Sequence, residues 1–306
     1  MFCFSPSAVA SLASRFLPAI VVLALIAVRA AAADQPKFDE LLNQAQSAFT
    51  NGQKTEAIAL ATKAIALDPK SLQGYYLRGR LFEAQKDHAK AIADFDQASK
   101  LDPAAADVYQ HRGSEHLKAG HLDQAIADFD RYLELDPKQK PHHWQRGIAL
   151  YLAGRYDDAR RQFELHQTVN NNDVENAVWH YLCVARQAGV EKARASLIKI
   201  QQDRRVPMMA VYALFSGKSN PEDVMAVARL GVAFPEQLKR QLFYGNYYIG
   251  LYYEAAGRDD LARDYVLRAV PQAMPADYMG DVARVHAEML NKRAARQAGP
   301  DEKKGK

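Results

Sequence analysis

The chain has 306 residues, of which 48% are apolar and 25% charged, a composition typical of a globular protein with an extensive core. Its formal net charge of +4 includes Arg15 and Arg29, which lie in a segment that we expect to be removed, so the mature chain would carry about +2. A charge this small excludes the strongly basic surface of a nucleic-acid-binding protein, and we expect no nucleic-acid partner.

Residues 1–33 have the pattern of a secretory signal peptide. Arg15 precedes the apolar stretch "FLPAIVVLALIAV" at 16–28, and the small residues Ala31 and Ala33 follow it. This order predicts cleavage near Ala33 and export to the periplasm or the medium. The apolar stretch is shorter than the roughly 20 residues of a membrane span, so we expect no stable membrane insertion after cleavage. The alternative is that this segment is not cleaved and remains as a membrane anchor.

A phrase occurs twice at a fixed offset, as "AIADFDQASKLDP" at 91–103 and "AIADFDRYLELDP" at 125–137. A fixed period of about 34 residues predicts stacked supersecondary units. The residues that keep the period are Pro69, Pro103 and Pro137, then Gly79, Gly113 and Gly147, and finally Ala57, Ala91, Ala125, Ala159 and Ala193.

Each copy of the phrase predicts an amphipathic helix. Its apolar positions fall on one face at helical spacing, which places Asp94 and Asp96 on the solvent side. The phased glycines remove bulk where paired helices cross, and Tyr75 and Phe95 are expected to fill the remaining space. Each Asp-Pro pair ends a helix, because proline lacks an amide donor and disfavours helical geometry in the residue before it.

The pattern resembles the tetratricopeptide repeat, a helix–turn–helix of about 34 residues. Arg78 departs from it, at a position where the family favours leucine. The resemblance implies an all-α solenoid, a right-handed superhelix of helix pairs, with a concave binding face. The residues that carry it in one copy are Tyr75, Gly79, Phe82, Ala91, Phe95, Ala98 and Pro103.

We expect this solenoid to occupy residues 34–275, followed by a capping helix at 276–296 and a disordered polar tail at 297–306. In the middle of the chain, Asn220 or Ser219 is expected to cap a helix that begins at Pro221. The expected repeats lie near 38–71, 72–105, 106–139, 140–173 and 174–207, with a degenerate pair at 208–242 and a last repeat at 243–275.

The sequence offers no constellation for catalysis. His111 and His116 are five apart, which places their rings on different sides of a helix, and His142 and His143 are adjacent. After signal cleavage Cys183 would be the single cysteine, and we expect it in the core. We therefore expect a protein that is not an enzyme, with no catalytic residues, no cofactor and no metal ion.

The candidate binding site follows from the resemblance, because the family lines its concave face with set positions of the first helix of each repeat. A groove with tryptophan, tyrosine and arginine has the side chains that are enriched at binding hot spots. For each position, packing against a neighbouring repeat is the alternative. The candidate groove residues are Tyr76, Arg80, Gln110, Ser114, Trp144, Tyr151, Tyr244 and Tyr247.

A narrower resemblance links the stretches 146–163 and 243–270 to the NlpI family of bacterial envelope lipoproteins, which are adaptors for a periplasmic protease and for cell-wall hydrolases. This chain lacks the lipid-accepting cysteine of that family. The expected function is an envelope scaffold or adaptor that binds a protein or peptide. The alternatives are an envelope hydrolase or metal-dependent enzyme, and a self-assembling structural protein such as a homodimer.

Overall fold

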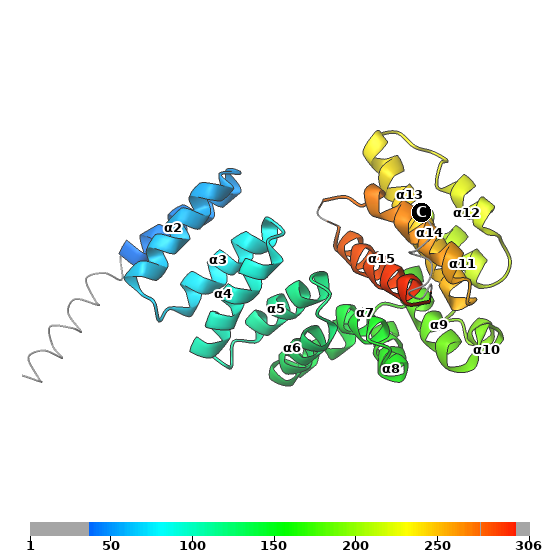
Figure 1. The fold of residues 1–306 in the computed structure, drawn as a ribbon, viewed down its shortest axis with the longest axis horizontal. Coiled ribbons are helices and arrows are strands. Elements are labelled where there is room, and N and C mark those ends of the chain that lie inside the picture. Colours follow the sequence, from blue (N-terminus) through cyan, green and yellow to red (C-terminus); the bar gives the residue numbers. More distant parts are fainter. Residues whose placement is uncertain (1–36, 276, 298–306) are drawn as a thin grey trace, which may run out of the picture. The chain divides into compact units, whose positions relative to one another are not determined.

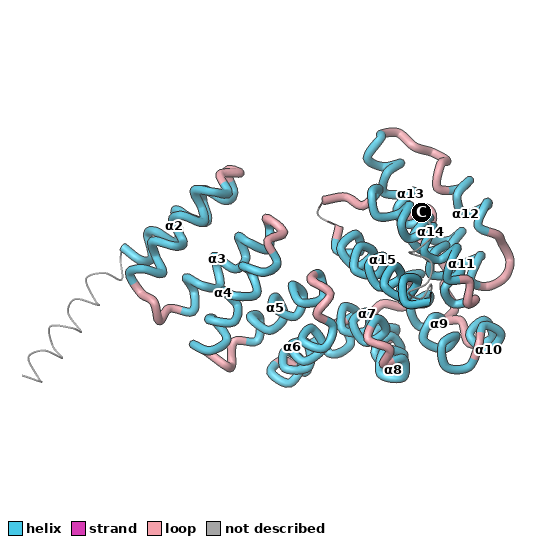
Figure 2. The backbone as a smooth tube through the Cα atoms, in the orientation of Figure 1, coloured by secondary structure: helices cyan, strands magenta, loops and turns pink. Residues whose placement is uncertain are grey.

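The computed structural model describes residues 37–275 and 277–297, and the predicted signal peptide and residues 298–306 of the predicted tail lie outside this range. Within these residues all regular elements are helices, joined mostly by short loops (Figure 2). None of these helices is long and apolar enough to cross a membrane. The chain divides into two compact units, with the boundary after Pro103.

The N-terminal unit is a series of antiparallel helices, coloured blue to cyan in Figure 1. Its core contains Ala45, Ala57, Ala61 and Leu81, so small side chains allow the helices to pack closely. Its helices are residues 37–50, α2 (Lys54–Leu67), α3 (Leu72–Ala84) and α4 (His88–Leu101).

The C-terminal unit begins with two further helix pairs and then becomes less regular. Where a fifth pair was expected at 174–207, α9 is followed by the six-residue helix α10 and an irregular segment. The elements are α5 (Ala106–Lys118), α6 (Leu122–Leu135), η1 (Pro137–His142), α7 (Trp144–Leu152), α8 (Tyr156–Gln167), α9 (Val174–Ala188), α10 (Val190–Ala195), α11 (Met208–Phe215), α12 (Pro221–Val227), α13 (Pro235–Ala255), α14 (Asp259–Ala269), η2 (Val270–Gln272) and α15 (Tyr278–Gln297).

Helix ends follow the sequence signals. Asp68, Asp102 and Asp136 are the C-terminal caps of α2, α4 and α6, so each phased Asp-Pro pair ends a helix as predicted. Asn220 caps α12, because its side chain accepts from the Asp223 amide at 2.9 Å and the Asp223 side chain accepts from the Asn220 amide. Both predictions are confirmed, since they rest on local backbone chemistry.

The phased glycines lie against the ring of a phenylalanine on the following helix. A β-carbon on Gly79 would lie 2.8 Å from Phe95, and one on Gly147 would lie 2.7 Å from Phe163. In the last pair Gly250 meets Val266, where a β-carbon would lie 2.6 Å from a methyl group and 3.1 Å from the Val266 backbone nitrogen. The close helix crossing predicted from the sequence is confirmed.

Replacing Gly250 by alanine is expected to lower the free energy of unfolding by about 1–3 kcal/mol, because backbone atoms of α14 cannot give way. Gly245, also in α13, is a matched control, because its β-carbon would meet the flexible Met225 side chain, with the sulfur at 3.1 Å. There the gain in helix propensity of about 1 kcal/mol offsets the contact. Urea denaturation of both variants measures the difference, and equal losses would contradict the packing argument.

The aspartates of the repeated phrase do not both face water, which corrects the prediction for Asp94. Its side chain is buried and pairs with Arg78, whose Nε and Nη2 donate at 2.8 and 2.7 Å. One repeat later, Arg112 pairs with the buried Asp128 in the same way, at 2.8 and 2.6 Å. Arginine at the position where the family favours leucine therefore neutralises a buried carboxylate.

Candidate functional site

The C-terminal helix α15 lies on the inner surface of the C-terminal unit, the surface made by α5, α7, α9 and α13 (red in Figure 1). Tyr278 packs edge-on against Trp144 of α7, with ring centroids 5.2 Å apart. Arg284 donates from Nη2 to the carbonyl oxygen of Lys118, the last residue of α5, at 2.5 Å. The predicted capping helix therefore covers part of the predicted groove, as well as packing on the last repeat.

A buried carboxylate ties α15 to the helices beneath it. Glu254 of α13 is 2% exposed and lies 3.0 Å from His286 of α15 and 2.5 Å from Arg186 of α9. Arg293 lies 3.3 Å away on the other side. Burial alone would raise the pKa of Glu254, but the neighbouring His286, Arg186 and Arg293 outweigh burial and lower it to about 2. Three helices are thus joined by one ionised group.

Four of the candidate groove residues lie elsewhere than predicted, because α15 and inter-helix bonds enclose them. Ser114, Tyr151 and Tyr247 are 5%, 3% and 0% exposed, so they are core residues. The OH of Tyr151 accepts from Arg186 at 3.4 Å, and the Tyr247 ring packs edge-on against His286.

The fourth of these residues, Gln110, is hydrogen-bonded between helices. Its Nε2 donates to Gln145 at 2.7 Å, and its Oε1 lies 2.6 Å from Nε2 of His143. His143 also accepts on Nδ1 from the Arg146 amide at 3.2 Å, so the neutral ring carries its proton on Nε2. Burial lowers the pKa of His143 to about 4, which agrees with a neutral ring. Gln110 therefore joins α5 to α7.

Two other candidates, Trp144 and Tyr244, line one hollow of about 440 Å³, which we call the aromatic pocket. They lie on α7 and α13, and further walls come from α8, α9, α15 and the irregular segment that contains Arg205. An adjoining hollow of about 330 Å³ shares Tyr244, Asp277 and Tyr278 with it. The side chains of the aromatic pocket used below are Trp144, Asn176, Trp179, Tyr244, Asp277 and Tyr278.

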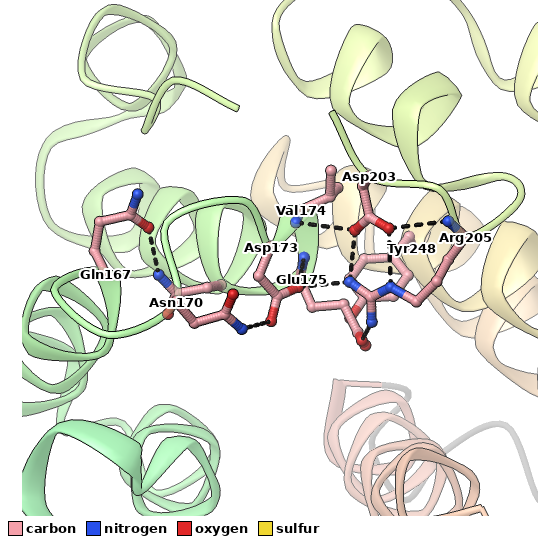
Figure 3. A network of polar contacts seen from close by, with 9 residues as sticks. Gln167, Asn170, Asp173, Val174, Glu175, Asp203, Arg205 and Tyr248 are labelled. Atoms are coloured by element: carbon pink, nitrogen blue, oxygen red, sulfur yellow. Dashed lines mark hydrogen bonds and ion pairs between the residues drawn. The ribbon is translucent and has the colours of Figure 1, made fainter. Parts of the chain in front are cut away.

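A polar network forms one side of the aromatic pocket (Figure 3). Arg205 pairs with Asp173 at 2.6 Å, with Asp203 at 2.5 Å and with Glu175. The Tyr248 hydroxyl donates to Glu175 at 2.6 Å. Burial raises the pKa of Glu175, although Arg205 acts in the opposite direction.

The sequence pattern does not predict this network. The Asp173 side chain caps α9 by accepting from the Glu175 amide at 3.0 Å. Arg205 lies in the irregular segment before α11, where repeat phase gives no guidance. The signal in the sequence is that charged residues stand at both ends of the expected repeat at 174–207, with Asp173 and Glu175 at one end and Asp203 and Arg205 at the other.

The N-terminal unit has a hollow of its own, of about 480 Å³, which contains the last two candidates. Tyr76 and Arg80 lie one turn apart on α3, and Arg80 pairs with Glu83 at 3.0 Å. We call this hollow the N-terminal groove. Its walls include Gln46, Phe49, Tyr76, Leu77, Arg80 and Glu83.

Cys183 is fully buried in α9, as predicted, and burial raises the pKa of its thiol, which keeps it in the unreactive protonated form. Burial also lowers the pKa of the nearby His180, whose Nε2 faces Glu164 at 3.4 Å. In the described parts of the chain, no three His, Cys, Asp or Glu side chains are grouped as metal ligands.

Comparison with known proteins identifies the same repeat that the sequence pattern predicts. The tetratricopeptide repeat family model matches residues 42–106 and 112–168. The chain is similar to the crystal structure of a tetratricopeptide repeat protein from Parabacteroides merdae, with 15% identity and a TM-score of 0.55 over 81% of this chain and 98% of that one. A search of the curated proteins found no match.

Two other solved structures share part of this likeness. A MamA protein is 16% identical over 64% of this chain and 97% of its own, with a TM-score of 0.49. YrrB, described as a tetratricopeptide repeat protein with an unusual peptide-binding site, is 17% identical over 75% of this chain and 97% of its own, with a TM-score of 0.40.

Helix pairs, phased glycines and a repeated Asp-Pro stop define an all-α helical-repeat solenoid. The part of the chain that the tetratricopeptide repeat family model matches is residues 42–106 and 112–168.

Proposed function

We propose that this protein is an exported interaction scaffold that binds an extended segment of a partner protein in the N-terminal groove. One observation carries the proposal: Tyr76 and Arg80, both predicted as groove residues, line a hollow of about 480 Å³ with Phe49 and Leu77. Tyrosine and arginine beside apolar walls are the usual anchors of a protein interface. By contrast, the inner surface of the C-terminal unit is partly covered by its own helix α15.

The scaffold would act by offering a preformed surface. Ala45, Ala57 and Ala61 are fully buried where the helices of the N-terminal unit pack together, so the groove backbone is already ordered before a partner binds. A rigid surface loses little conformational entropy on binding, which leaves more of the contact energy as affinity. The export that the proposal assumes is supported by the signal pattern in residues 1–33. Amino-terminal sequencing of the mature protein tests it, with a start near Ala33 or Asp34 expected.

Photocrosslinking in cells tests the groove. A photoreactive residue in place of Tyr76 is expected to capture a defined partner, because this side chain lines the hollow. A photoreactive residue in place of Leu230, which is 66% exposed in the C-terminal unit, is the matched control for random encounters.

For the partner identified in this way, Arg80→Ala is expected to weaken binding by at least about tenfold, the scale of a hot-spot arginine. The same substitution should leave the unfolding transition unchanged, because Arg80 is exposed. A partner that is captured equally from both positions, or that binds Arg80→Ala normally, would argue against the N-terminal groove.

A further inference from the structure

Two buried polar atoms on the wall of the aromatic pocket have no hydrogen-bond partner within the protein. Asn176 is 3% exposed, and its Nδ2 donates to the Phe163 carbonyl and to Gln167 at 3.1 Å, whereas its Oδ1 accepts from no protein group. Trp179 is 2% exposed, and its Nε1 is also without a partner. Because leaving a buried polar atom unpaired is costly, the oxygen of Asn176 favours a ligand that donates hydrogen bonds. The Trp179 N–H is a donor and would need an acceptor from another part of the ligand, such as a peptide carbonyl.

The charges around the pocket favour a positively charged ligand. Arg205 carries one positive charge and faces the three carboxylates of Asp173, Glu175 and Asp203. Asp277 also lines the pocket, and the adjoining hollow contributes one further arginine, Arg240. The three lining carboxylates, Asp173, Glu175 and Asp277, against two arginines leave an excess of one negative charge. Burial raises the pKa of Asp277 despite the nearby Arg240, so the ionised form of this carboxyl would gain from another positive neighbour.

The walls suit a flat cation. Trp144 and Tyr278 pack edge to face, with their ring planes at 84°. The Tyr278 ring already attracts one cation, because Nζ of Lys118 lies 5.3 Å from its centroid. Tyr244 lines both hollows. A guanidinium is planar, stacks on aromatic faces and donates several hydrogen bonds to carboxylate and amide oxygens, whereas an ammonium is compact and strongly hydrated.

We propose that the aromatic pocket binds the side chain of an arginine presented by a partner protein. In this arrangement the guanidinium stacks against the aromatic walls and donates to Asp277 and to Oδ1 of Asn176. The pocket belongs to the C-terminal unit and is separate from the N-terminal groove, so the inference stands or falls independently of the proposed function.

The two tryptophans of the sequence, Trp144 and Trp179, both line the pocket and serve as reporters. The probe is the capped peptide acetyl-Gly-Arg-Gly-amide, titrated into the whole chain labelled with ¹⁵N. We expect saturable shifts of both indole N–H resonances, which a Trp144→Phe variant assigns. The same peptide with citrulline, which keeps the shape but lacks the charge, is expected to bind at least about tenfold more weakly.

Asp277→Asn keeps an oxygen that can accept from the Met279 amide, as Asp277 does at 3.0 Å, but removes the charge. It is expected to weaken the arginine peptide about tenfold. Asp264→Asn, at a carboxylate with 47% side-chain exposure, is the matched control and should bind as the wild type does.

Equal binding of the arginine and citrulline peptides, or tighter binding of a lysine peptide, would overturn the proposal without any variant being made. Tyr76→Ala in the N-terminal groove should leave the arginine response unchanged, which separates a failure here from a failure of the groove.

Discussion

Replacing Glu254 by glutamine is expected to lower the free energy of unfolding at pH 7 by about 3 kcal/mol. The carboxylate is 2% exposed and is the shared partner of Arg186, His286 and Arg293. Glutamine has a similar shape but no charge, so it leaves Arg186 without its carboxylate partner and Arg293 with Asp259 alone, at 3.5 Å. Urea denaturation followed by circular dichroism measures the loss.

The control is Glu288→Gln on α15, where the carboxylate is 53% exposed and pairs with Arg284 at 3.1 Å. An exposed pair of this kind contributes less than about 1 kcal/mol. If both variants lost the same small amount, the cluster around Glu254 would not be what ties α15 to α9 and α13.

The same residue predicts how stability depends on pH. The pKa of Glu254 is about 2 in the folded chain and about 4.5 when unperturbed, so the unfolded chain takes up this proton first as the pH falls. Its contribution is therefore fully present above pH 4.5 and declines towards pH 2, by about 3 kcal/mol in total. The difference in stability between wild type and Glu254→Gln should shrink over that window. A difference that stayed constant from pH 7 to pH 3 would contradict the assignment.

The repeated helix pairs could be predicted from the sequence because they depend on neighbours at short, regular separations. Gly79 and Phe95 have the same spacing as Gly147 and Phe163, and the two residues meet wherever two such helices cross. Asp102 and Asp136 end helices through the proline that follows each of them. These signals can be recognised in a single sequence because the same residues recur in each helix pair.

The position of α15 could not be predicted in this way. Its bond from Arg284 to Lys118 joins residues 166 apart, and no period in the sequence relates them. Repeat phase therefore placed Tyr247 and Trp144 on the same face, but it could not show that α15 encloses the first and leaves the second on a pocket wall. The same limit explains why Arg205, in an irregular segment, was not recognised as a partner of Asp173.

The two aspartates of the phrase "ADFD" at 127–130 give a second test, because the sequence treats them alike and the structure does not. Asp128 has 8% of its side chain exposed and receives two hydrogen bonds from Arg112, at 2.8 and 2.6 Å. Asp130 has 41% exposed and pairs with Arg146 through Nε at 2.6 Å. Arg112 itself has only 17% of its side chain exposed, so the pair is largely shielded from water.

Asp128→Ala is therefore expected to lower the free energy of unfolding by about 3 kcal/mol, because it removes the buried carboxylate that accepts two hydrogen bonds from the Arg112 guanidinium. Asp130→Ala, two residues away on the same helix, should cost less than about 1 kcal/mol, since water and salt already screen that pair. Urea denaturation of the two variants under one set of conditions gives the comparison. Similar losses would mean that the buried pair adds no more than the exposed one, and the role of arginine at this repeat position would need another explanation.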